Sequence, residues 1–114
     1  MGSVGIDIIE IGDFKRRLRR SKKMIDRLFT QNEKNYCERK GIMHLASRFA
    51  AKEALAKASG INNLKWQELE VINLPSGKPI FKLSGDAKKS LRGKHIDISI
   101  SNTKSSAVAV VIII

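Results

Sequence analysis

Two carboxylates and a lysine stand out from the stretches of sequence that surround them. Asp7 interrupts the β-branched stretch 4–11, where an aspartate is uncommon. Glu53 and Lys57 are four residues apart in the alanine-rich stretch 47–58, so a helix would carry both on one face. Two carboxylates suit Mg²⁺, which keeps several waters and takes further ligands from substrate phosphates. A nearby lysine would balance the charge of the same phosphates.

Each of these residues also has a purely structural explanation. Glu53 and Lys57 could form an exposed ion pair worth about 0.3–0.5 kcal/mol. Asp7 could face water from an edge strand, whereas in a buried position it would need a partner or a metal. Gly5, next to it, would allow a ligand or another chain to approach the backbone closely. The sequence has no glycine-rich phosphate loop and no HExxH motif.

The composition is that of a small basic protein. The 114 residues include 22 Lys+Arg and 11 Asp+Glu, a net charge of +11, and the length suits one domain over residues 1–114. Such an excess favours an anionic partner. Residues 13–40 hold eleven Lys/Arg against four Asp/Glu, a net charge of +7. This stretch is therefore either a docking surface for an acidic partner or only a solvated face.

The cysteine content and the apolar runs bear on location. The single cysteine, Cys37, excludes a disulfide within the chain and fits a reducing cytosol. No secretory signal is visible at the N-terminus, and the longest apolar run, residues 107–114, is too short to span a bilayer. We therefore expect a cytoplasmic protein.

The elements that must position these residues follow from the periodicity of apolar side chains. Helices are expected at residues 14–29 with a break near Ser21, 31–40, 42–59 and 84–93. Strands are expected at residues 4–11, 69–74, 78–83, 95–101 and 107–114. The pattern predicts an α+β fold, with a small and mainly antiparallel sheet packed on the long helix and the last four strands in a meander. The apolar last strand would be central in the sheet or would meet another subunit.

Three stretches together resemble the holo-(acyl-carrier-protein) synthases, which are single-unit 4′-phosphopantetheinyl transferases. They are GIDIIEI (5–11), SRFAAKEA (47–54) and SISNTK (99–104), and LFTQNE (28–33) and GKP (77–79) also fit in the expected order. The resemblance implies the single-unit 4′-phosphopantetheinyl transferase fold. It also implies Mg²⁺-dependent transfer of 4′-phosphopantetheine from coenzyme A to a serine of apo acyl carrier protein. The second product would be adenosine 3′,5′-bisphosphate.

The resemblance also assigns residues to each part of the site. It implies Mg²⁺ on Asp7 and Glu53, and a homotrimer with active sites between its subunits. We predict that Glu53 takes the serine proton, directly or through a metal-bound water, and that Lys57 steadies the leaving phosphate. The residues expected at coenzyme A are Arg48, Lys57, Gly77, Lys78, Pro79, Ser101, Asn102 and Thr103. The residues expected at the carrier protein are Lys15, Arg16, Arg20, Lys23 and Arg27.

Two positions depart from the family pattern. Asn102 stands where the family has histidine, so this position can hydrogen-bond a phosphate or ribose but cannot take up a proton. Asp13 stands where the family has an arginine that helps to hold the carrier, and Lys15 or Arg16 are candidates to replace it.

Two other functions compete with transfer. The chain could be an inactive member of the family, or a basic module that binds nucleic acid through the charge of its backbone. Nucleic-acid phosphates would repel Asp7 and Glu53 unless a metal intervened. We therefore expect coenzyme A and the carrier protein as partners, and neither nucleic acid nor a membrane.

Overall fold

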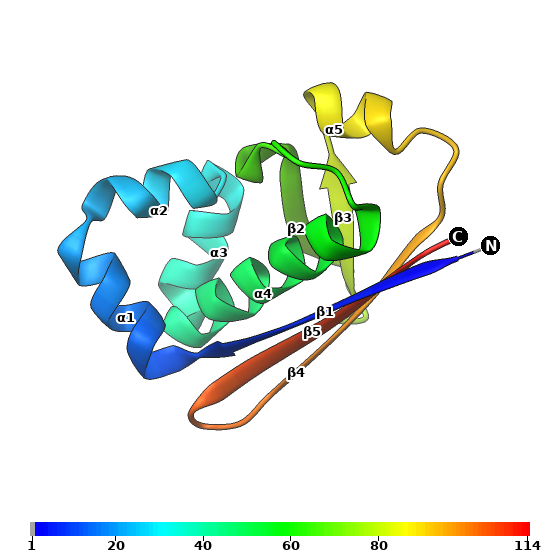
Figure 1. The fold of residues 1–114 in the computed structure, drawn as a ribbon. Helices are drawn as coiled ribbons and strands as arrows, with labels where there is room; N and C mark the ends of the chain where they lie inside the picture. The colour runs from blue at the N-terminus through cyan, green and yellow to red at the C-terminus, as the bar shows by residue number, and fades with distance from the viewer. Residues whose placement is uncertain (1) are drawn as a thin grey trace.

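The elements occur in the order that the periodicity predicts, with boundaries that differ by a few residues. A computed structural model describes residues 2–114, and Figure 1 shows their arrangement. The helices and strands are β1 (Ser3–Glu10), α1 (Ile11–Arg20), α2 (Lys22–Leu28), α3 (Gln31–Lys40), α4 (Ile42–Ser59), the 3₁₀ helix η1 (Trp66–Glu68), β2 (Leu69–Asn73), β3 (Pro79–Leu83), α5 (Gly85–Ser90), β4 (Ile96–Asn102) and β5 (Ser106–Ile113). The fold is α+β, as expected, and α4 packs against the sheet that contains β1 and β5 (Figure 1).

The expected meander of the last four strands is wrong. β2 and β3 form a separate hairpin, in which Leu69 lies opposite Leu83 and Asn73 lies opposite Pro79. β4 instead joins β5 and β1 in a three-stranded sheet with the order β1-β5-β4. The helix α5 and the turn after it lead the chain from the hairpin to this sheet (Figure 1). Periodicity identifies a strand, but the partner of the strand depends on where such a connection takes the chain.

Helix α4 packs closely on β1 because small residues meet there. Gly5 is buried beneath the helix, and a Cβ atom added to it would lie 2.0 Å from the carbonyl oxygen of Ala54 and 2.7 Å from the nitrogen of Ala58. Only glycine fits at this position. The close approach expected at Gly5 is thus made by the chain's own helix, not by a ligand or another chain. It brings Asp7, on the same face of β1, against α4.

The opposite face of the three-stranded sheet is apolar and exposed. β1 directs Val4, Ile6 and Ile8 outward, with 65%, 59% and 67% of their surface accessible, and β5 adds Ile112 with 42%. β5 is the central strand of the sheet, as one of the two expectations for the last strand had it. Nevertheless, nothing among residues 2–114 covers the outer face of the sheet. An exposed apolar patch of this kind marks an interaction surface.

The helices α1 and α2 are held against α4 by aromatic side chains. The expected break near Ser21 is confirmed, since α1 ends at Arg20 and α2 begins at Lys22. The ring of Phe14 stacks on that of Phe49 with 5.6 Å between centroids, and Phe29 meets Phe14 edge-on. This contact buries one side of α1 and α2 and leaves their basic side chains outside.

A buried ion pair connects the helices to the hairpin. Lys52 and Glu33 are both fully buried, and the Lys52 Nζ atom lies 2.6 Å from Glu33 Oε1. Lys52 also donates to the carbonyl oxygens of Leu28 and Trp66, so all three of its protons are used. Glu33 Oε2 accepts from the backbone nitrogen of Val71 on β2. One pair therefore fixes the end of α2, α3, α4, η1 and β2 relative to one another.

A helix that crosses a membrane must be both long and apolar. Among residues 2–114, no helix is both long enough and apolar enough to do so.

Candidate active site

Asp7 lies in the middle of β1, on the face that α4 covers. Its side chain is 14% exposed, and Oδ1 accepts a hydrogen bond of 3.0 Å from Lys57 Nζ. Lys57 also donates to the carbonyl oxygen of Ile6, again at 3.0 Å. The other carboxylate oxygen of Asp7, Oδ2, is buried and has no hydrogen-bond donor among residues 2–114. An unpartnered buried carboxylate oxygen is costly, so this atom is well suited to bind a cation.

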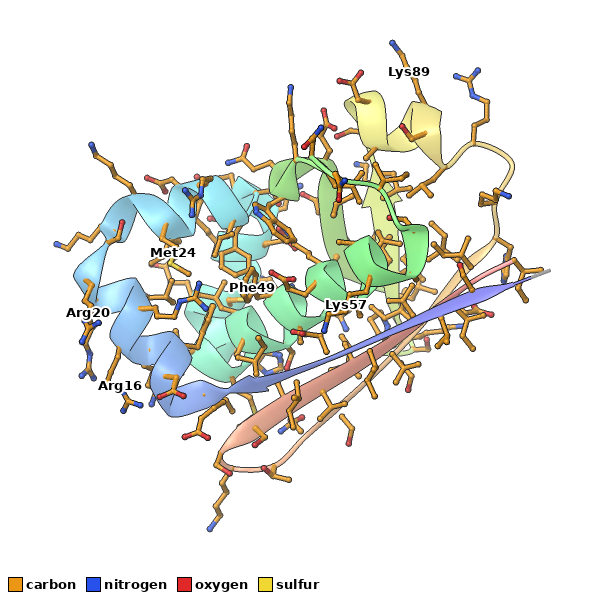
Figure 2. All side chains as sticks on the ribbon, in the orientation of Figure 1. Arg16, Arg20, Met24, Phe49, Lys57 and Lys89 are labelled. Carbon is orange, nitrogen blue, oxygen red and sulfur yellow. The ribbon has the colours of Figure 1, made fainter. Side chains whose placement is uncertain are left out.

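The exposed ion pair between Glu53 and Lys57, favoured by their spacing alone, is absent among residues 2–114. Lys57, which follows Glu53 by one turn of α4, pairs with Asp7 instead. Figure 2 shows Lys57 on α4. Burial raises the pKa of Glu53, and the neighbouring Asp7 carboxylate raises it further, while Lys57 and Arg17 oppose the shift. Two carboxylates are thus close enough to repel each other, and a divalent cation would relieve that repulsion.

The donor set of this pair limits the kind of metal it could hold. Within residues 2–114, no group of three or more His, Cys, Asp or Glu side chains could hold a metal ion. Structural zinc and calcium sites need more protein ligands than the two carboxylates of Asp7 and Glu53. Mg²⁺ needs few, because it keeps waters and binds substrate phosphates. The buried, unpartnered Oδ2 of Asp7 and the nearby Glu53 therefore fit Mg²⁺.

Glu53→Gln should make the metal-free protein more stable than the wild type at neutral pH. The pKa of Glu53 is raised in the folded chain, so the native state binds its proton more tightly than the unfolded state does. Ionised Glu53 therefore lowers stability increasingly as the pH rises from 4.5, its ordinary value, through the raised value. Thermal midpoints in EDTA across pH 4–8 should show a modest gain for the variant that disappears at the acid end.

The matched control for this change is Glu38→Gln, at an exposed glutamate on α3. It should shift the midpoint little, because substitutions at exposed positions usually change stability by less than about 0.5 kcal/mol. A stability gain for Glu53→Gln that did not depend on pH would contradict the inference that the ionised carboxylate of Glu53 destabilises the fold.

The residues expected at coenzyme A fall into two groups, of which the first surrounds the β2–β3 turn. Arg48 Nη2 donates to Asn73 Oδ1 at 2.6 Å, and Asn73 Nδ2 donates to the carbonyl oxygen of Gly77 at 3.0 Å. Arg48 is only 3% exposed, and its guanidinium lies 4.3 Å from the centroid of the Tyr36 ring. Arg48 thus holds the turn in position, while Lys78 is the exposed cation at its tip. Pro79 follows as the first residue of β3.

The second group is at the end of β4. Asn102 faces the α4 side of the sheet, and its Nδ2 lies 2.7 Å from the sulfur of Met43. Ser101 pairs with Val108 and faces the exposed outer side. The hydroxyl of Thr103 accepts hydrogen bonds within the β4–β5 turn. One chain alone therefore does not bring Ser101 to the sheet face that carries Asp7 and that α4 covers.

The five residues expected at the carrier protein are exposed on α1 and α2 but lie on different sides of them. Arg16 and Arg20 project from α1 away from α4 (Figure 2). Lys23 and Arg27 line one hollow of about 390 Å³. Lys15 lines a different hollow, of about 460 Å³. Lys23 and Arg27 therefore share one hollow, and Lys15 lines another.

Two features of the site were missed in the sequence. Arg17 lies over the ring of Phe49, with its guanidinium carbon 6.0 Å from the centroid, and its charge acts on Glu53. Its position next to Leu18, at the border of the buried stripe of α1, was the only available signal. The second missed feature is the buried ion pair of Lys52 and Glu33. Lys52 directly precedes Glu53 on α4. A lysine within an otherwise apolar helix surface was the signal for that pair.

This chain is similar to known proteins in sequence and in structure. Residues 3–111 match the 4′-phosphopantetheinyl transferase superfamily. A holo-(acyl-carrier-protein) synthase of Alkaliphilus oremlandii is 44% identical over 113 residues, which cover 93% of each chain. An ACPS-CoA complex from Chronobacterium ammoniagenes has a TM-score of 0.90 at 26% identity, and covers 99% of this chain and 96% of that chain. A holo-(acyl-carrier-protein) synthase from Bacillus anthracis, in complex with CoA (3′,5′-ADP), has a TM-score of 0.81 at 34% identity, with 97% and 94% covered.

Proposed function

This chain belongs to the 4′-phosphopantetheinyl transferase superfamily, and on that premise we propose that it transfers 4′-phosphopantetheine from coenzyme A to a serine of apo acyl carrier protein. It is an enzyme of the holo-(acyl-carrier-protein) synthase kind. The observation that carries the proposal is the meeting of Asp7, Glu53 and Lys57, with a buried carboxylate oxygen left without a partner. This arrangement provides both a cation site and a lysine for a pyrophosphate.

In the proposed reaction, the serine oxygen attacks the phosphorus atom that bears pantetheine, and the bond from that phosphorus to the bridging oxygen breaks. Adenosine 3′,5′-bisphosphate leaves with the bridging oxygen. Glu53 accepts the serine proton. Lys57 donates to the leaving phosphate. Mg²⁺, held by Asp7 and Glu53, would supply charge stabilisation for the pyrophosphate oxygens.

We also propose that three copies of the chain assemble through the exposed face of the β1-β5-β4 sheet, with coenzyme A bound between copies. Val4, Ile6 and Ile8 supply an apolar surface there that residues 2–114 leave uncovered. Ser101 on that outer face, and Asn102 on the inner face, could serve one ligand only if a second copy completed the site. Sedimentation equilibrium at three times the mass of the chain would support this assembly, and a monomer at micromolar concentration would contradict it.

The basic surface of α1 and α2 supports the carrier as the second substrate. The five predicted residues are exposed on these helices, and an acidic carrier would be attracted to their charge: Lys15, Arg16, Arg20, Lys23 and Arg27. The location of the enzyme in the cytoplasm stays a prediction. So does the expectation that neither nucleic acid nor a membrane is a partner.

The transfer is tested by incubating the protein with coenzyme A, Mg²⁺ and apo carrier, and then weighing the carrier by mass spectrometry. The expected result is a mass increase of one phosphopantetheine group, which EDTA prevents. A carrier of unchanged mass would favour the inactive member of the family. Retention of labelled RNA or DNA under the same conditions, with no transfer, would favour the nucleic-acid module.

A further inference from the structure

We propose that His44 binds the 3′-phosphate of coenzyme A in its protonated form, so that binding of the coenzyme takes up a proton. This inference rests on the proposed function, and the family resemblance assigned no role to His44. It supplies a titratable group for the coenzyme in a chain whose Asn102 cannot take up a proton.

The first argument is that His44 adjoins both groups of residues expected at coenzyme A. It is in the first turn of α4, one turn before Arg48, which holds the β2–β3 turn through Asn73. Its neighbour Met43 contacts Asn102 at the end of β4, with 2.7 Å between the sulfur and Nδ2. The start of α4 therefore connects the two groups within one chain, and His44 belongs to that connection.

The second argument is a cluster of basic side chains around Tyr36 that has no acidic partner. The His44 ring meets the Tyr36 ring edge-on, with 5.7 Å between centroids, and the Arg48 guanidinium lies 4.3 Å from the centroid of the same ring. Lys40, exposed in the last turn of α3, also acts on His44. Among residues 2–114, none of the three basic side chains forms an ion pair. Such a surplus of positive charge favours an anionic ligand.

The third argument is an unused donor within this cluster. The Nε atom of Arg48 is buried and has no hydrogen-bond acceptor among residues 2–114. A buried donor without an acceptor is costly, and a phosphate oxygen would satisfy it. The cluster therefore has both the charge and a free donor for a phosphate group.

The fourth argument concerns the proton. Burial lowers the pKa of His44 from its ordinary value of 6.5, and the charges of Arg48 on α4 and Lys40 on α3 lower it further. Tyr36 is the titratable group in direct contact with the ring. His44 is therefore mainly neutral at pH 7 in the free protein. A bound phosphate dianion would favour the charged ring, so the pKa of His44 should rise on binding.

The position of His44 along α4 identifies the phosphate. His44 precedes Glu53 by nine residues, which is about 13–14 Å along the helix axis. The pyrophosphate belongs, in the proposed reaction, to the site of Asp7, Glu53 and Lys57, at the far part of this helix. The remaining phosphate of coenzyme A is the one on the 3′ position of the ribose.

The test measures binding of adenosine 3′,5′-bisphosphate by calorimetry between pH 6 and pH 8, in buffers of different ionisation enthalpy that report proton uptake. Binding of coenzyme A is compared with that of dephospho-coenzyme A, which lacks the 3′-phosphate. His44→Gln keeps a neutral polar group and His44→Phe keeps a ring beside Tyr36, but neither side chain titrates. His95→Gln is the matched control, because His95 is the other histidine of the chain and is exposed.

From pH 8 to pH 6, the affinity of the wild type for the bisphosphate should rise about tenfold more than that of either His44 variant. This difference corresponds to a rise of one unit in the pKa of His44 on binding. Titration of the 3′-phosphate itself, near pH 6, is common to all the proteins and cancels in the comparison. At pH 8, His44→Gln should bind within about twofold of the wild type, because His44 is neutral there.

The controls separate His44 from other sources of pH dependence. His95→Gln should behave as the wild type, and dephospho-coenzyme A should bind to His44→Gln and to the wild type with the same pH dependence. In NMR spectra of His95→Gln, His44 is the single histidine. Its pKa should lie below 6.5 in the free protein and should rise when the bisphosphate binds.

Three results would overturn the inference. One is the same pH dependence of binding in the wild type and in both His44 variants. Another is a pKa of His44 that does not rise when the bisphosphate binds. The third is loss of the proton uptake in His95→Gln. Because these measurements need no carrier, a protein that takes up the proton but leaves the carrier unmodified would refute the proposed function and leave this inference standing.

Discussion

Replacing Asp7 by Asn lowers kcat/KM for transfer by about 10³-fold or more, and this is the largest effect on activity that we expect from a single substitution. A bound metal supplies several kcal/mol of charge stabilisation in such reactions, and each 1.36 kcal/mol corresponds to a factor of ten. Asn can still accept the hydrogen bond of Lys57 through Oδ1, so the shape of the site should persist. The charge on Oδ2, the atom without a partner, is removed.

The measurements for this variant are transfer to the carrier and Mg²⁺ binding by calorimetry. The thermal midpoint serves as a test of folding. Asp86→Asn, at an exposed position on α5, is the matched control and should alter none of them. Mg²⁺ should raise the thermal midpoint of the wild type and of the control but not that of Asp7→Asn, because a ligand stabilises only a state that binds it. Wild-type turnover in Asp7→Asn would refute the metal assignment.

Replacing Lys52 by Met destabilises the fold by about 3–5 kcal/mol, the usual effect of leaving one member of a buried ion pair without its partner. Glu33 would lose its buried cationic partner, and the carbonyl oxygens of Leu28 and Trp66 would each lose a donor. For a domain of this size, stability is itself only about 5–15 kcal/mol. Urea unfolding followed by circular dichroism should show the loss as a lower midpoint with a similar slope.

Two further variants separate the pair from a general effect of the substitution. Lys65→Met, at an exposed lysine, should change the free energy of unfolding by less than about 0.5 kcal/mol. Adding Glu33→Gln to Lys52→Met should recover about 1–2 kcal/mol, since a neutral amide is less costly to bury and can still accept from Val71. A double variant no more stable than Lys52→Met would mean that the lost bonds to the carbonyl groups, not the stranded charge, dominate.

Elements that depend on local sequence were predicted well. The bounds of α4 agree with the prediction, because an alanine-rich stretch without proline or glycine favours a helix and Gly60 can adopt the left-handed φ of 67° that ends it. The capping box of Thr30 and Glu33 at the start of α3 is confirmed for the same local reason. The alternation of β1 correctly assigned Gly5 and Asp7 to the same face.

The candidate site shows where sequence reasoning stops. The two carboxylates were identified from their positions in β1 and α4, and their roles at the metal stay predictions. The spacing favoured Glu53 as the partner of Lys57, whereas the structure pairs Lys57 with Asp7, fifty residues earlier. Arg17 was overlooked among eleven basic residues of its stretch, since nothing in that stretch indicated that Phe49 would lie beneath it.

The sequence by itself therefore determined the helices, the strands, the face on which Asp7 lies and the family that the chain resembles. Only the tertiary structure decided the split into two sheets, the partners of Lys57 and Lys52, and the direction of Arg17. The reason is that periodicity and capping are set by neighbours within a few residues. The partner of a charged side chain depends on which distant elements pack together, and at Gly5 that packing is set by contacts with Ala54 and Ala58.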